Sequence, residues 1–478
     1  MPRRVGRSEI HVPIERQPGV PLRIQLERAL RAAIQTGRLS PGVLLPSTRV
    51  LASDIGVSRG VVVAAYEQLL AEGYLSSHSG SSTVVSHRPT SSPPSEPGSK
   101  PIRAPRFDFR PGRPDHALFP RRAWSSALRR VLSTATYAAL DYPEAGGALT
   151  ARIALAAYLN RSRATATCAE RVIFCSGFAQ GMRLACETLK ARGVRRIAVE
   201  DPGHAYESRD VSASELELVP VPVDDSGLCV ERLARLDVGA VYVTPAHQYP
   251  TGAVLSPSRR VALLDWARQR DAFIVEDDYD GEYRYDREPV GALQGLDPDR
   301  VIYIGSASKI LAPALRIGWL LTPQPLLQDL TQSKLDADRG SPGLDQLALA
   351  EFIERGDLDR HLRRTRLVYS RKRAQLANVL GALMPTYPIS GVAAGLHLIL
   401  ELPKATDETA IVAEALRGGI HVHGLEAYSA RRRGARPGLL LGYCRLSETD
   451  MKEGAKALAQ VISACSQSLG DTRIEKAG

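Results

Sequence analysis

The stretch that decides the fold of most of this chain is residues 301–322, VIYIGSASKILAPALRIGWLLT. Residues 301–304 are apolar and mainly β-branched, which is typical of a buried strand. Lys309 follows the end of that strand, and Arg316 comes seven residues later, where a second apolar run begins. A lysine held at a rigid strand end can form a Schiff base with an aldehyde when partial desolvation lowers its pKa.

The residues around Lys309 also suit a phosphate group. Ser306, Ser308 and Arg316 supply the hydroxyl and guanidinium donors that a phosphate dianion prefers. An aldehyde and a phosphate together indicate pyridoxal 5′-phosphate (PLP), bound as a Schiff base to Lys309. The alternative is a solvated lysine after a strand. The order of strand, Ser-x-Ser-Lys and arginine favours the cofactor site.

Strand-like runs alternate with helical stretches on both sides of this stretch. The alternation predicts an α/β fold with a large, mainly parallel sheet. Ligands of such sheets bind at the carboxyl ends of the strands. The predicted strands are residues 171–175, 196–200, 215–223, 240–244, 273–278, 301–305 and 317–321.

Two of these strand ends carry further candidate cofactor residues. Ser176, Gly177 and Phe178 open a helix, where free backbone N–H groups make an anion seat, although many strand–helix turns contain glycine. Asp277 is placed to keep a pyridine nitrogen protonated, and Tyr279 to donate to the phenolic oxygen of the cofactor. The alternative for this second turn is a metal site or a solvated acidic turn.

Two other turns allow more than one interpretation. His204 follows a predicted strand and would either stack on the cofactor ring or serve as a structural histidine. Residues 244–252 contain polar groups that would reach the ring oxygen, but the Pro and Gly of this segment equally suit a plain turn.

Composition sets broader limits. The chain has 478 residues, which favours two or more domains, and a net charge of +10. Residues 1–106 contain 14 Lys and Arg against 7 Asp and Glu, which favours a nucleic-acid partner. The 6 cysteines form no Cys-x-x-Cys pair, so neither zinc nor a disulfide framework is expected. No secretory signal or membrane-spanning run is evident, so we expect a cytoplasmic protein without membrane contact.

Residues 1–86 carry the pattern of a winged helix-turn-helix. Apolar residues recur every four positions over residues 22–34, and two shorter helices follow, which begin after Ser47 and Ser58. A small hairpin over residues 74–85 would form the wing. The alternative is a three-helix packing module with exposed arginines. The residues expected at DNA phosphates or base edges are Ser47, Thr48, Arg49, Ser58, Arg59 and, in the wing, Gly80.

Residues 87–106 are rich in Pro and Ser and predict a semi-extended linker. Residues 107–470 form the second predicted domain, which contains the sheet and Lys309. The linker would let the first domain reach DNA at a distance from the second.

The first domain resembles the winged helix of GntR-type bacterial regulators. The resemblance rests on GRLSPGVLLPSTRVLA at residues 37–52, GVSR at 56–59 and EGYL at 72–75. It implies that Arg49 and Arg59 contact DNA. Gly60 stands where members often have Thr, and the wing lacks their Gly-x-Gly-Thr tip, differences that concern base preference rather than the fold.

Most of residues 107–445 resembles the fold-type I PLP enzymes of the aspartate aminotransferase family, which implies a small α+β subdomain beside the large sheet. The resemblance implies that Lys309 is the Schiff-base lysine, that Arg316 binds phosphate, and that Asp277 and Tyr279 bind the ring. Both domains together resemble the MocR/GabR-type transcriptional regulators. The strings shared with that group are VTPAHQYPTG at residues 243–252, EDDYDGEYRYD at 276–286 and ALQGLD at 292–297.

The chain departs from these families at the substrate side of the site. Aminotransferases clamp the substrate carboxylate with an arginine in a late strand, and that position falls near Leu440 here. Arg436 and Arg445 are out of register with it, Tyr206 replaces an arginine of GabR-type members, and His204 replaces a common Tyr. Loss of a bidentate clamp removes orientation as well as binding.

We therefore expect a PLP-binding transcriptional regulator that senses PLP, an amine or an amino acid through aldimine exchange at Lys309. The resemblance also implies a homodimer, since fold-type I relatives build the pocket from two subunits, and double-stranded operator DNA with paired half-sites or direct repeats. One alternative is an active aminotransferase with a vestigial DNA-binding module. The other is a DNA-binding protein whose large domain only dimerises.

Overall fold

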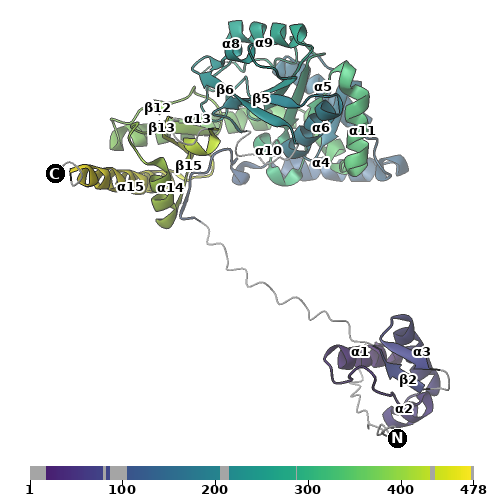
Figure 1. Ribbon diagram of the computed structural model, residues 1–478. Helices are drawn as coiled ribbons and strands as arrows, with labels where there is room; N and C mark the ends of the chain where they lie inside the picture. Colours follow the sequence, from purple (N-terminus) through teal and green to yellow (C-terminus); the bar gives the residue numbers. More distant parts are fainter. Residues whose placement is uncertain are drawn as a thin grey trace. The chain divides into compact units, whose positions relative to one another are not determined.

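The computed structural model describes residues 18–78, 82–86, 105–204, 215–286, 288–430 and 436–474. The chain divides into two compact units, Met1–Arg103 and Ala104–Gly478 (Figure 1). Each unit is described by itself below. Within the described residues, no helix is both long and apolar enough to cross a membrane.

The first unit is a winged helix-turn-helix. Ser47 caps the second helix by accepting a hydrogen bond from the Val50 N–H, and Gly56 ends it with a positive φ of 65°. Leu26, Leu51 and Leu69, one from each helix, are almost fully buried in a common core. The elements are α1 (Leu22–Gln35), α2 (Thr48–Ile55), α3 (Arg59–Ala71), β1 (Leu75–His78) and β2 (Ser82–Val85), with the two strands antiparallel.

An eight-stranded sheet forms the centre of the second unit, in the order β4-β11-β10-β9-β8-β5-β6-β7. The five strands from β10 to β6 are parallel, whereas β11 and β7 run antiparallel to their neighbours. The mainly parallel sheet that the sequence predicted is thereby confirmed. The strands are β4 (Val172–Cys175), β5 (Arg196–Asp201), β6 (Glu217–Asp224), β7 (Gly227–Leu228), β8 (Ala240–Val243), β9 (Phe273–Asp278), β10 (Val301–Ser306) and β11 (Gly318–Leu321).

Helices cover both faces of this sheet because the side chains of each strand alternate between the faces. In β10, Ile302 and Ile304 join the core cluster that contains α6 and α11, whereas Val301 and Tyr303 join clusters on the other side. The helices of this part are α4 (Arg121–Thr134), α5 (Leu149–Arg163), α6 (Phe178–Ala191), α8 (Val230–Leu233), α9 (Pro257–Gln269), α10 (Ala307–Ile310), α11 (Leu327–Asp338) and α12 (Gly343–Glu354).

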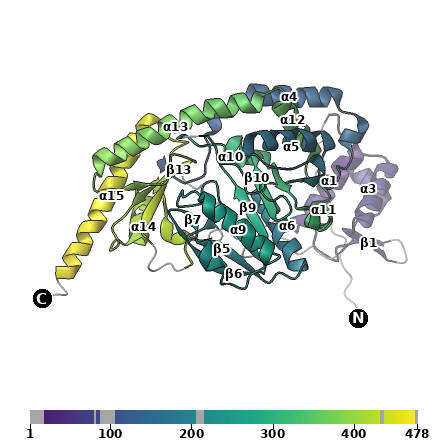
Figure 2. The same ribbon diagram turned by 90° about the horizontal axis from the view of Figure 1, so that it is seen from above.

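A small α+β subdomain completes the second unit. Its antiparallel sheet has the order β12-β13-β16-β15, and the long helix α13 runs from it to α12 and α4 (Figure 2). A separate parallel pair, β3 with β14, ties the start of the unit to this subdomain. The elements are α13 (Asp357–Leu383), α14 (Glu408–Arg417), α15 (Glu448–Ile474), β3 (Phe107–Asp108), β12 (Ile389–Ser390), β13 (His397–Glu401), β14 (Ile420–His421), β15 (His423–Gly424) and β16 (Gly438–Gly442).

Candidate functional site

Lys309 lies in the short helix α10, three residues after the end of β10. Its Nζ donates a hydrogen bond to the carbonyl oxygen of Gly112, at 2.6 Å. Burial lowers the pKa of this amine, although the nearby Asp280 and Asp277 oppose the shift, and the positive charge of Arg113 adds to it. Compared with a free lysine, Lys309 is therefore shifted toward the neutral amine, which is the nucleophilic form.

Asp277 lies on the neighbouring parallel strand β9, opposite Ile304 of β10. It is buried and accepts a hydrogen bond from the Tyr242 hydroxyl at 2.9 Å. Burial raises the pKa of Asp277 to about 8, against the lowering effect of the Tyr242 hydrogen bond. Within the described part of the chain, Asp277 forms no ion pair, so a protonated ring nitrogen would supply the cation that this buried carboxylate lacks.

The two flanking carboxylates have other partners. Glu276 accepts the backbone N–H groups of Leu293 and Gln294, at 2.8 and 3.0 Å. Asp278 pairs with the buried Arg163 through two hydrogen bonds of 2.6 and 3.0 Å. Burial of all three carboxylates argues against a solvated acidic turn, and the described residues contain no group of three potential metal ligands. Alternation along β9 thus leaves Asp277 alone available to a ligand.

Tyr279 belongs to a second polar network just beyond β9. Its hydroxyl lies 2.9 Å from Nδ1 of His247, and the same nitrogen lies 3.1 Å from Oδ2 of Asp280. The ring of Tyr249 packs edge-on against Tyr279 with centroids 5.6 Å apart. The turn at residues 244–252 therefore meets the turn after β9, as expected for neighbouring strand ends, and it brings a histidine to Tyr279.

The predicted anion seat lies at the start of α6. Gly177 has a φ of 93°, and a Cβ added to it would lie 3.2–3.4 Å from the guanidinium group of Arg316. Arg316 also donates to the Ser176 carbonyl oxygen. The Ser176 N–H donates to the Gln180 side chain at 2.7 Å and is therefore occupied. The N–H groups of the first turn of α6 have no partner within the helix and can bind an anion. Gly177 thus keeps open a cradle between α6 and Arg316.

Ser306 ends β10 and is buried, while Ser308 lies one residue before Lys309 and is half-buried. His204 lies beyond β5, with its ring 5.7 Å from that of Phe178 and 5.4 Å from that of Tyr249. The structure therefore brings the predicted cofactor residues to the same end of the sheet. Their individual roles stay predictions.

Gly177→Ala is expected to weaken binding of PLP roughly tenfold while leaving binding of pyridoxal, which lacks the phosphate, almost unchanged. The added methyl group would enter the cradle beside Arg316. Gly193→Ala is the matched control, because Gly193 has a φ of 90° and nothing lies within 4 Å of its added Cβ. Both variants place a Cβ at a positive φ, which costs on the order of 1–3 kcal/mol. Fluorescence titration measures the affinities of both variants for PLP and pyridoxal. An equal loss of PLP affinity in the two variants would contradict a phosphate site at Gly177.

The candidate DNA-contact residues lie at the starts of α2 and α3. Arg49 and Arg59 are exposed, and the Nε atom of Arg59 lies 3.5 Å from the hydroxyl oxygen of Thr48. Ser47 caps α2 and Ser58 precedes α3. Gly80 lies outside the described residues.

Comparisons with known proteins agree with both units. Residues 22–85 match the bacterial regulatory proteins of the gntR family, and residues 112–458 match the aminotransferases of class I and II, which are PLP-dependent. PdxR of Corynebacterium glutamicum, a pyridoxine biosynthesis transcriptional regulator, is 34% identical over 95% of this chain and 99% of its own. MocR of Rhizobium meliloti, a probable rhizopine catabolism regulatory protein, is 32% identical over 95% and 96%.

The chain belongs to the HTH-type transcriptional regulators of the MocR/PdxR kind. The predicted family, both folds and the PLP-dependence of the large domain's family are thereby confirmed. Among solved structures, a multiple substrate aminotransferase from Thermococcus profundus matches with a TM-score of 0.70 and 26% identity, over 76% of this chain and 92% of that one. A Pyrococcus horikoshii kynurenine aminotransferase matches with a TM-score of 0.68 and 26% identity, over 75% and 91%.

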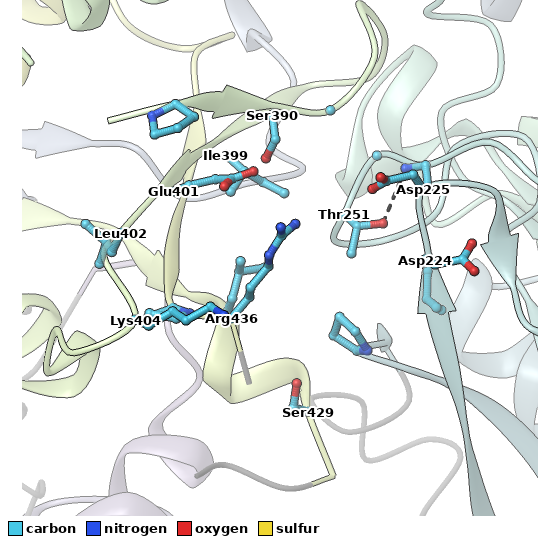
Figure 3. A pocket seen from close by; sticks show the side chains of 18 of the residues that line it. Asp224, Asp225, Thr251, Ser390, Ile399, Glu401, Leu402, Lys404, Ser429 and Arg436 are labelled. Carbon is cyan, nitrogen blue, oxygen red and sulfur yellow. Dashed lines mark hydrogen bonds between the residues drawn. The ribbon is translucent and has the colours of Figure 1, made fainter. Parts of the chain in front are cut away.

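A large cleft in this regulator lies apart from Lys309. It has a volume of about 1080 Å³ and separates the edge of the large sheet from the small subdomain (Figure 3). The Arg436 side chain points into it, between Glu401 on one wall and Thr251 on the other. Arg436 therefore lines this cleft, whose lining does not include Lys309.

Sequence reasoning missed three residues that act on the predicted site. Gly112 accepts the hydrogen bond from Lys309, Arg113 influences its pKa, and His247 contacts Tyr279. His247 stood in a polar turn that the sequence had singled out. Gly112 and Arg113 lie far before Lys309 in the chain and carried only the signal of a Pro-Gly turn.

Proposed function

We propose that this regulator binds operator DNA through its winged helix, binds PLP at Lys309, and changes its state on DNA when PLP or an amine occupies that site. One observation carries the proposal. The buried Asp277, the lysine of lowered pKa and the Gly177–Arg316 cradle meet at one end of the sheet, in a chain that also presents exposed arginines on a helix-turn-helix.

Bound PLP would supply an aldehyde and an electron-withdrawing ring. Lys309 would hold the aldehyde end, because burial lowers the pKa of its amine and so makes the neutral, nucleophilic form more accessible. Asp277, oriented by the Tyr242 hydroxyl, would accept a hydrogen bond from the protonated ring nitrogen and so keep it protonated. Arg316, the start of α6, Ser306 and Ser308 would bind the phosphate, and Tyr279 would donate to the ring oxygen. The ring of His204 would stack on the cofactor.

We propose that the large domain serves regulation rather than aminotransferase turnover. Leu440, at the place of the expected carboxylate clamp, is buried in β16 among Ile399, Leu425 and Tyr428. Arg436 lines the separate cleft, and Arg445 lies near Asp108. Position 440 therefore lacks the arginine that would orient a substrate carboxylate in the usual way.

A homodimer and a PLP-related signal complete the proposal. Tyr137 and Tyr142 are 96% and 86% exposed, and with Leu132 and Leu140 they give a segment of apolar surface that suits a second copy. PdxR, a relative named for pyridoxine biosynthesis, supports PLP as the signal. We place the domain limits at 1–86, 87–106 and 107–470, and the protein in the cytoplasm with its DNA.

Arg59→Ala is expected to lower the affinity for operator DNA roughly tenfold or more, because Arg59 begins the helix that enters the major groove. Arg28→Ala removes the same charge from the exposed side of α1 and should have a much smaller effect. The assay is fluorescence anisotropy of full-length protein on the DNA upstream of its own gene, with and without PLP. Equal losses in the two variants, or no effect of PLP on the wild type, would contradict the proposal.

A further inference from the structure

A cluster of charged residues lies beside Lys309, outside the set assigned to PLP. Asp108 accepts two hydrogen bonds of 2.6 Å from the guanidinium group of Arg110. Two further guanidinium groups, from Arg113 and Arg445, lie 3.8 and 3.5 Å from Oδ2 of the same carboxylate. Three positive groups thus share a single carboxylate.

The backbone fixes this cluster next to the lysine. Gly112 has a φ of 67°, its carbonyl oxygen accepts the Lys309 hydrogen bond, and a Cβ on it would lie 3.1 Å from the Lys309 Nζ. Arg113 is the next residue, and its charge contributes to the pKa of Lys309. Arg445 follows β16, which is tied to this segment by a 2.7 Å hydrogen bond from the Gly442 N–H to the Phe109 carbonyl.

The charges in the cluster are unbalanced. Arg110 already occupies both oxygens of Asp108, so the longer contacts of Arg113 and Arg445 leave most of their N–H groups for another acceptor. Burial and the neighbouring Arg110 and Arg445 lower the pKa of Arg113, although Asp108 opposes the shift. Both side chains stay partly open to solvent, at 43% and 38% exposure. A second anion at this place would relieve the repulsion.

We propose that Arg113 and Arg445 bind the carboxylate of an amine effector whose amino group is directed to Lys309, so that this regulator responds to amino acids rather than to simple amines. The inference rests on the proposed PLP site. Guanidinium groups match a carboxylate geometrically. Those of Arg113 and Arg445 come from different segments of the chain and both lie near the Asp108 carboxylate. They would replace the absent arginine at position 440.

The competing interpretation is an ion-pair network that only holds β3 against the end of β16. Such a network would affect stability but would not distinguish a carboxylated amine from its decarboxylated counterpart. The decisive quantity is therefore the ratio of affinities within such a pair, measured at equal PLP loading.

The experiment uses full-length, PLP-loaded wild type, Arg113→Gln/Arg445→Gln and the control Arg232→Gln/Arg235→Gln. The control removes two exposed arginines at and after α8. Each protein is titrated with glycine against methylamine, β-alanine against ethylamine, and 4-aminobutanoate against propylamine. Absorbance of the bound PLP reports binding, and thermal unfolding reports stability.

In the wild type and the control, at least one amino acid should bind about tenfold or more tightly than its decarboxylated partner, and in the Arg113/Arg445 variant that ratio should fall to about one. An unchanged ratio with a lower melting temperature would overturn the inference in favour of the structural network. No preference in the wild type would overturn it as well. Absence of PLP absorbance in the wild type would instead refute the proposed PLP site, and the inference with it.

Discussion

Lys309→Ala is expected to abolish covalent retention of PLP by this regulator. The residue lies in α10, three residues after the end of β10, with an amine whose pKa is lowered by burial, and the charge of Asp277 on the adjacent strand acts on it. The variant keeps the Gly177–Arg316 cradle and Asp277, so it should still bind PLP weakly and reversibly. The covalent link and the effect of PLP on DNA binding should both be lost.

The measurement is mass spectrometry after treatment with borohydride, which fixes a carbon–nitrogen link between PLP and a lysine. The wild type should carry one adduct, on the peptide that contains Lys309. Lys404→Ala, which changes an exposed lysine of the same unit, should behave as the wild type. An adduct that persists in Lys309→Ala would show that another lysine holds the cofactor.

Arg163→Ala is expected to lower the free energy of unfolding of the large domain by about 3–5 kcal/mol, because it leaves Asp278 buried without its cation. The side chains of Arg163 and Asp278 are 0% and 2% exposed and share hydrogen bonds of 2.6 and 3.0 Å. Asp278 would keep only the Tyr303 hydroxyl as a side-chain donor among the described residues.

The control lies two residues away on the same helix. Arg161 pairs with Asp359 at 2.9 Å, but its side chain is 62% exposed, so Arg161→Ala should cost less than about 1 kcal/mol. The free energy of unfolding of both variants is measured with denaturant, over the concentrations at which the large domain unfolds. Similar costs for the two would show that the buried pair contributes no more than a surface pair.

The candidate site was predictable where it depends on short segments. Lys309 and Arg316 lie in one strand–turn–strand segment, and Asp277 and Tyr279 lie in another, so strand periodicity and the rule for strand ends were enough to place them together. The alternation along β9 also explains why Asp277 has other partners than Glu276 and Asp278, which are occupied by the Leu293 N–H and by Arg163.

The rest depends on contacts between distant segments. Arg163 meets Asp278 across 115 positions, and Lys309 meets Gly112 across 197, and no local pattern encodes such pairings. The Tyr279–His247 contact likewise required the neighbouring order of β8 and β9. By contrast, the hydrogen bond between the Ser176 N–H and Gln180 spans only four residues and follows from ordinary helix-start geometry.

The hydrogen bond between Lys309 and Gly112 links the binding pocket to the first residues of the second unit. Gly112 comes only seven positions after Pro105, the first described residue of the second unit. A ligand that takes the lysine amine away from this carbonyl would release its restraint on residues 105–112. Occupancy of the pocket would thus act first on the opening segment of the second unit, before any change in the large sheet.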